Sequence, residues 1–222
     1  MTISRRTILT GAAVAAASTM MPAATAAPAP RPPRTTIVVA PHPDDETLYL
    51  SGYITYAEAC GDRLILLAVT DGGATTARPA GWTVSELEAI RRTEQAAAWR
   101  ALTRGRGEIT RLQLPDGGRG TLTAPVRDAV RGLDGPGVEF YVAANDGQSL
   151  DHTGVVQGVR TSGVRIARYA NKTGSTTGYR YPPVDLAACR TAAGCYAAVG
   201  HRSVPSMFAA LDANGYVSRV TA

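Results

Sequence analysis

The chain has 222 residues, of which 45% are hydrophobic and 18% are charged, and this composition excludes a disordered or a fibrous protein. Its length suits one domain with enough chain to bury a core. The formal net charge is +5, but the basic residues are spread along the chain and form no run of the kind that binds nucleic acid. We therefore expect no nucleic-acid partner.

The start of the chain differs in composition from the rest. Two arginines, Arg5 and Arg6, stand before an apolar run that is too short to span a bilayer, and small residues suited to cleavage follow it. This pattern predicts a twin-arginine (Tat) signal peptide at residues 1–26 and a proline-rich spacer at residues 27–34 that stays outside the fold. We expect an exported protein, secreted or held in the cell envelope, whose mature part is one domain at residues 35–222 without a membrane span.

Short apolar runs alternate with helical patterns through the first two thirds of this domain. Continuous β-branched runs predict strands buried on both faces, and a T-x-x-E capping box at residues 83–86 predicts the start of a long helix. This order predicts an α/β fold, a Rossmann-like three-layer helix–sheet–helix sandwich with a mostly parallel sheet. In chain order we expect a strand at 35–40, a helix at 46–59, a strand at 63–70, a helix from 83 to about 101, a strand at 109–114, a helix at 124–133, a strand at 138–143 and a helix at 153–169.

The signals are weaker after residue 170. We expect a polar loop at residues 171–183, helices within residues 186–211 and a final edge strand at residues 215–220. Cys189 and Cys195 in an exported chain favour a disulfide over a metal pair, because their spacing is wide for zinc.

The motif that carries chemistry is His42-Pro43-Asp44-Asp45-Glu46, between the first strand and the next helix. In open α/β sheets ligands bind at this carboxyl edge of the strands. A helix start explains the acids as caps, but it explains neither the histidine nor two adjacent carboxylates beside it. A divalent cation explains both, and a catalytic zinc needs three protein ligands. The third ligand is expected from His152, which also follows a strand, and His201 is the weaker candidate.

The motif at residues 42–46, together with the distant Asp151-His152 pair, resembles the PIG-L/LmbE-like family of zinc-dependent deacetylases, which act on N-acetylglucosaminyl groups and related amides. The resemblance runs from about residue 36 to residue 203. It includes weaker segments in the family's order: Thr70-Asp71-Gly72, Arg91-x-x-Glu94, Leu114-Pro115-Asp116-Gly117 and a late segment with His201 and Ser203.

The resemblance implies one Zn²⁺ per chain, held by His42, Asp45 and His152. Asp44 would be the general base that takes a proton from the zinc-bound water, and Asp151 would orient His152. The implied function is an exported hydrolase that deacetylates an N-acetylated amino sugar or a related small amide. Its partner would be a small molecule or glycan that carries an N-acyl group.

The sequence departs from the family at one position. The family commonly has H-x-x-H, whose first histidine helps to stabilise the oxyanion or to protonate the leaving amine, and Ser149 stands there in this chain. A serine cannot act as an imidazolium acid, so Gln148, Ser149 or His201 would have to substitute.

Other polar residues of these segments have both structural and functional interpretations. We expect Arg91 and Glu94 to form a buried ion pair beneath the site rather than to touch substrate. Asp71 and Asp116 are each followed by glycine, so they are expected to be turn residues, with substrate contact as the alternative.

Two other functions fit parts of the pattern. A non-catalytic sugar-binding or envelope-binding module would explain the missing histidine. A non-haem iron oxygenase would use the H-x-D…H spacing of residues 42, 44 and 152, but those enzymes use barrel-like β folds.

Overall fold

The structure is a computed structural model that describes residues 31–117, 122–144, 149–171 and 178–222. The expected signal peptide at residues 1–26 lies outside the described residues. Within the described part, no helix combines the length and apolar character needed to cross a membrane.

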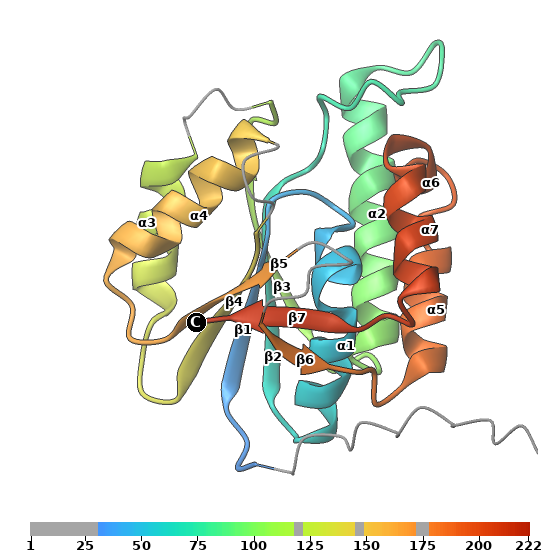
Figure 1. The fold of residues 1–222 in the computed structure, drawn as a ribbon. Coiled ribbons are helices and arrows are strands. Elements are labelled where there is room, and N and C mark those ends of the chain that lie inside the picture. Colours follow the sequence, from blue (N-terminus) through green and yellow to red (C-terminus); the bar gives the residue numbers. More distant parts are fainter. Residues whose placement is uncertain (1–30, 118–121, 145–148, 172–177) are drawn as a thin grey trace, which may run out of the picture.

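A seven-stranded sheet forms the centre of the molecule, in the order β3-β2-β1-β4-β5-β7-β6 (Figure 1). The five strands from β3 to β5 are parallel, whereas β7 runs antiparallel to both of its neighbours. The sequence prediction of a mostly parallel α/β sheet is therefore confirmed. The strands are β1 (Thr35–Ala40), β2 (Arg63–Thr70), β3 (Glu108–Leu114), β4 (Val138–Ala143), β5 (Ala167–Asn171), β6 (Tyr179–Tyr181) and β7 (Ser218–Thr221).

Helices cover both faces of the sheet, which gives the expected three layers (Figure 1). One layer contains α3 (Thr123–Leu133) and α4 (Leu150–Ser162), and the other contains α1 (Asp45–Ala59), α2 (Val84–Leu102), α5 (Leu186–Gly194), α6 (Gly200–Ser203) and α7 (Pro205–Ala213). Alternate residues of one strand serve the two layers, because successive side chains point to opposite faces. Val38 and Ala40 belong to the core beneath α1, while Ile37 and Val39 belong to the core beneath α3 and α4.

Local sequence signals explain how the main helices begin and pack. The capping box is present: the Glu86 N–H donates to Thr83 Oγ1 at 3.2 Å, and the Thr83 N–H donates to the Glu86 carboxylate at 2.8 Å. Helix α1 is buried from Asp45 to Glu58, so its sequence does not separate a polar face from an apolar face. Gly52 lies in its middle because a Cβ there would be 2.3 Å from the Tyr181 carbonyl oxygen.

Three element predictions are wrong. The polar loop expected at residues 171–183 contains strand β6. The expected helix at residues 153–169 is instead α4 followed by β5, because Gly163 takes a left-handed conformation (φ 77°) that ends the helix. The C-terminal strand is not an edge strand. It lies between β5 and β6, where the Ser218 hydroxyl accepts a hydrogen bond from the Tyr53 N–H at 3.1 Å.

The expected disulfide is also wrong, since Cys189 and Cys195 are both free. Cys189 lies in α5 and Cys195 is its C-terminal cap, six positions further along the chain. Six helical residues turn the chain by about 600° and raise it by roughly 9 Å, so the two side chains point in different directions.

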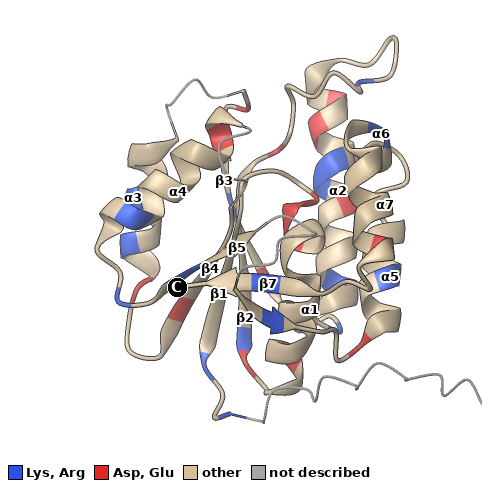
Figure 2. Ribbon diagram, viewed as in Figure 1, with Lys and Arg blue, Asp and Glu red and all other residues tan. Residues whose placement is uncertain are grey.

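The end of the spacer belongs to the fold. Arg31 donates two hydrogen bonds to Asp62, at 2.9 and 2.7 Å, and one to the Tyr53 hydroxyl at 3.2 Å. The chain therefore enters the domain beside the turn between α1 and β2. Basic and acidic residues are interspersed over both helical layers in the view of Figure 2.

Candidate metal centre and active site

The His42–Glu46 motif turns the chain from β1 into α1. Asp45 is the first residue of α1, and its Oδ2 accepts a hydrogen bond from the His42 N–H at 2.8 Å. A carboxylate in the first turn is favoured by the exposed N–H groups of the helix. The local fold thus holds a histidine and a carboxylate together at the carboxyl end of β1.

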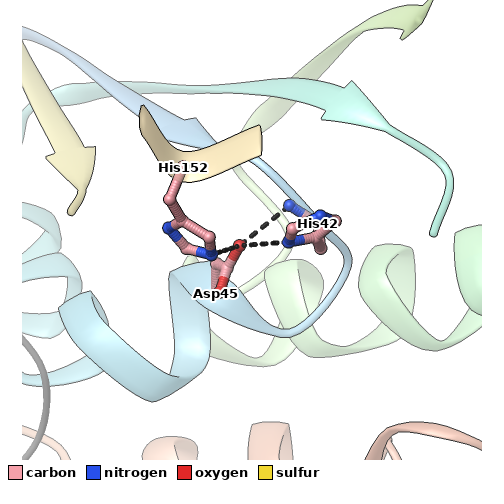
Figure 3. Close-up of side chains that lie close together, drawn as sticks. All are labelled: His42, Asp45 and His152. Carbon is pink, nitrogen blue, oxygen red and sulfur yellow. Dashed lines mark hydrogen bonds and ion pairs between the residues drawn. The ribbon is translucent and has the colours of Figure 1, made fainter. Parts of the chain in front are cut away.

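His152 completes a group of three possible metal ligands (Figure 3). Asp45 Oδ2 lies 3.3 Å from His42 Nδ1 and 3.4 Å from His152 Nε2. Two ligand atoms that share a tetrahedral zinc at about 2.0–2.2 Å lie roughly 3.3–3.5 Å apart. Two imidazoles and one carboxylate are also a donor set that zinc accepts, so the residues present fit this metal.

A backbone carbonyl orients His152. Its Nδ1 lies 3.0 Å from the carbonyl oxygen of Ala143, the last residue of β4. Because a carbonyl only accepts hydrogen bonds, Nδ1 carries a proton, and Nε2 is left as the ring nitrogen that faces Asp45 and could bind a metal. Ala143 thus makes the contact that we expected from Asp151.

Two further carboxylates meet the other side of the His42 ring. His42 Nε2 lies 3.2 Å from Asp116 Oδ1 and 3.3 Å from Asp151 Oδ2. The Gly117 N–H donates to the same two oxygens, at 2.8 and 3.0 Å. Asp116 is therefore part of the site as well as a turn residue.

These contacts change the pKa values of the groups in the metal-free protein. Burial alone would lower the pKa of His42, but hydrogen bonds with Asp116, Asp151 and Asp45 raise it well above its usual value. Burial alone would raise the pKa of Asp45, but His152 and His42 hold it below its usual range. Zinc binding at His42 would therefore compete with a proton, whereas Asp45 is already ionised.

Asp44 is held by an arginine of α2. Its carboxyl is buried, and its Oδ2 accepts a hydrogen bond from Arg91 at 2.9 Å, while Arg91 also donates to the Pro43 carbonyl. Burial raises the pKa of Asp44 well above its usual value, against the opposing charge of Arg91. Asp44 also has an unusual backbone, with φ 114°.

The expected ion pair between Arg91 and Glu94 is wrong. Arg91 points to Asp44, whereas Glu94 Oε1 accepts the backbone N–H groups of Ala198 and Val199 at 2.8 and 2.9 Å. Through these two hydrogen bonds, Glu94 links the segment before α6 to α2.

Glu46 has a structural position behind the site. It is fully buried and accepts hydrogen bonds from the side chains of Tyr196, Thr47 and Gln95. Asp71 lies in ion pairs with Arg92 and Arg111, at 2.7 and 3.6 Å.

A cavity of about 330 Å³ opens over these groups. Its wall includes the histidine and aspartate cluster and Arg91, and it also includes Ser149, whose hydroxyl accepts the Asp151 N–H at 3.2 Å and caps α4. His201 does not line the cavity. It is exposed, its Nε2 lies 2.9 Å from the Ala193 carbonyl oxygen, and its ring stacks on Phe208. Gln148 lies outside the described residues.

Several residues of the cavity wall were missed by sequence reasoning, among them Thr75, Val204 and Met207. None of them belongs to a pattern that indicates a site. Asp116 had such a signal, since it follows a strand at the carboxyl edge of the sheet.

This chain is therefore an α/β protein with a candidate metal centre, because three possible metal ligands meet at the carboxyl edge of its parallel strands. Residues 37–162, more than half of the chain, match the family described as PIG-L: GlcNAc-PI de-N-acetylase. The chain therefore belongs to the PIG-L family, as its motifs indicated. No curated protein matches the chain.

Solved structures share this fold at low sequence identity. A conserved protein from Thermus thermophilus is 20% identical with a TM-score of 0.64, over 85% of this chain and 94% of that one. The N,N'-diacetylchitobiose deacetylase from Pyrococcus horikoshii is 19% identical with a TM-score of 0.60, over 85% and 83%. The 4-carboxy-2-hydroxymuconate hydratase GalB from Pseudomonas putida is 13% identical with a TM-score of 0.61, over 79% and 83%. A hydratase and a deacetylase thus share this fold, so the site has to decide the reaction.

Proposed function

We propose that this protein is a zinc-dependent hydrolase that removes the acetyl group from an N-acetylated amino sugar or a related small amide. One observation carries the proposal: His42, Asp45 and His152 present ligand atoms with zinc-like spacing in the same cavity as the buried Asp44. Membership of the PIG-L family and the deacetylase of similar fold support the same reaction.

Three side chains would hold the metal. His42, Asp45 and His152 would supply three ligand atoms at the cavity, and three protein ligands are the number that catalytic zinc sites use. When bound, zinc supplies a Lewis acid that polarises the amide carbonyl and lowers the pKa of a coordinated water toward about 7. The contact from Ala143 to His152 keeps that ring in the ligand tautomer.

Asp44 would move the proton. Arg91 occupies Oδ2, which leaves Oδ1 of Asp44 to take a proton from the attacking water. The water oxygen adds to the carbonyl carbon, and the bond between that carbon and the amide nitrogen breaks. Because Ser149 cannot act as an imidazolium acid, the proton on Asp44 Oδ1 passes to the leaving nitrogen. The products are then one carboxylic acid and one amine, and the second proton of the water passes from the acid to the amine to give a carboxylate and an ammonium group.

The proposed enzyme works outside the cytoplasm. Arg5 and Arg6 before the apolar run support export by the twin-arginine route, which carries folded proteins. Replacing both arginines with lysine in the full-length chain tests this, because the protein should then stay in the cytoplasmic fraction. Unchanged export would refute this part of the proposal.

The first experiment measures bound metal and released acetate. We expect about one zinc per mature chain and release of acetate from an N-acetylated amino sugar. A chain that binds no zinc when zinc is supplied would refute the enzyme proposal and favour the binding module. Iron in place of zinc would favour the oxygenase.

Asp44→Asn tests the base with little change of shape. We expect this variant to bind zinc and to lose turnover, because its side chain cannot take the proton. Asp71→Asn is the matched control, since Asp71 is a buried acid at the end of β2 that does not line the cavity. Loss of zinc in Asp44→Asn would mean that Asp44, and not Asp45, is the ligand.

A further inference from the structure

The walls of the cavity differ in chemistry. The lining includes charged groups around His42, Asp44 and Arg91, and it includes an apolar wall made of Leu48, Tyr49, Val204 and Met207, which belong to one core or pack on it. A volume of about 330 Å³ is at the small end of the range of about 300–1,000 Å³ for small-molecule sites. The cavity therefore encloses one sugar-sized unit and its acyl group, and larger parts of a substrate stay outside.

The apolar wall begins beside the metal ligands. Leu48 and Tyr49 follow Asp45 by three and four positions, so they share its face of α1. The Tyr49 ring lies 6.0 Å from the ring of His152, centre to centre. The apolar wall therefore begins next to one of the proposed metal ligands.

The far part of this wall comes from the C-terminal helices. Val204 and Met207 are half-buried, pack on the core that contains Leu48 and Tyr49, and line the cavity. Both lie beyond residue 162, where the family match ends. The far part of the wall therefore lies outside the segment that matches the family.

The two sides of an N-acyl amino sugar also differ in polarity: the sugar on the amide nitrogen is polar, and the acyl chain on the carbonyl carbon is apolar. The sugar on the nitrogen side carries hydroxyl groups, which need polar partners such as Asp116, Thr75 and Ser203 in the cavity wall. The carbon attached to the carbonyl is apolar and gains free energy from burial against apolar side chains. The acyl group therefore fits the wall formed by Leu48, Tyr49, Val204 and Met207.

We propose that this apolar wall accepts N-acyl groups longer than acetyl, and that Met207 sets their maximum length. The inference rests on the proposed function and names its substrate class: N-acylated amino sugars with short unbranched acyl chains. Methionine suits this position, because its unbranched thioether side chain adapts to chains of different length.

The test compares N-acetyl-, N-propionyl- and N-butanoyl-glucosamine as substrates of the zinc-loaded mature chain. Each added methylene is expected to raise kcat/KM about fourfold, as its burial predicts. Met207→Trp should lower the butanoyl-to-acetyl ratio at least tenfold, and Met207→Ala should extend the series to longer chains. Ala209→Trp is the matched control, since Ala209 is exposed on the same helix and does not line the cavity.

A rate that falls steadily from acetyl to butanoyl in the unmodified protein would overturn the inference. Equal changes on all three substrates in both Met207 variants would overturn it too, because they would indicate a purely structural residue. Calorimetry with acetate and butanoate needs no turnover: butanoate should bind more tightly, and Met207→Trp should abolish the difference. If that preference is found but no amide is hydrolysed, the proposed function fails while the apolar wall stands. If neither is found, both fail.

Discussion

The backbone at Asp44 predicts that this residue reduces the stability of the protein. Asp44 caps α1 at φ 114° and ψ −26°, and its side chain makes no capping hydrogen bond. An L-residue in the left-handed region costs about 1–2 kcal/mol, and such strain collects at functional sites. Glycine would avoid the cost, but it cannot place a carboxylate against Arg91. We therefore expect Asp44→Gly to be more stable than Asp44→Ala.

The magnitude comes from a difference between two pairs of variants. Both Asp44 variants lose the same carboxylate and leave Arg91 unpaired, so this cost of about 3–5 kcal/mol cancels between them. Ordinary preferences between glycine and alanine at a helix N-cap are measured with Asp185→Gly and Asp185→Ala, because Asp185 caps α5 at φ −127°. The glycine advantage at position 44 should exceed that at position 185 by about 1–2 kcal/mol.

Urea unfolding followed by circular dichroism measures this difference. The protein should be metal-free, because zinc bound only to the folded state would add stability of its own. With a slope of about 2 kcal/mol per molar urea, the extra separation of the two midpoints at position 44 should be about 0.5–1 M. Equal glycine advantages at positions 44 and 185 would refute the idea that Asp44 is strained.

Three other variants test the surroundings of the site. Ser149→His should raise kcat by supplying an acid, and slower turnover would mean that the cavity is shaped around serine. The same variant should lower the free energy of unfolding by about 1 kcal/mol through loss of the α4 cap. Glu94→Ala should cost about 2–4 kcal/mol and speed amide hydrogen exchange at residues 198 and 199, and unchanged exchange would show that its two bonds do not hold the C-terminal helices. Arg31→Ala should cost about 1–2 kcal/mol in urea unfolding through its bonds to Asp62, and no loss would return residues 31–34 to the spacer.

Most of the fold could be predicted from the sequence because its signals are local. Continuous apolar runs marked β1, β2 and β4, and a T-x-x-E box marked the start of α2. The errors came where a local signal was weak or had a second meaning. Gly163 could have been a glycine within a longer helix, but it ends α4. The position of β7 depends on pairing with strands that are distant in the sequence.

The sequence by itself determined the candidate metal-binding motif, because His42 and Asp45 are held together within one turn of chain. The sequence also indicated His152, and only the tertiary structure decided which contacts the distant groups make. Asp116 follows β3, His152 lies in the first turn of α4, and Arg91 reaches Asp44 from α2. Met207 enters the cavity wall because α7 packs on the core beside α1. The positions of these side chains depend on the packing of whole helices and strands, and spacing in the sequence does not record that.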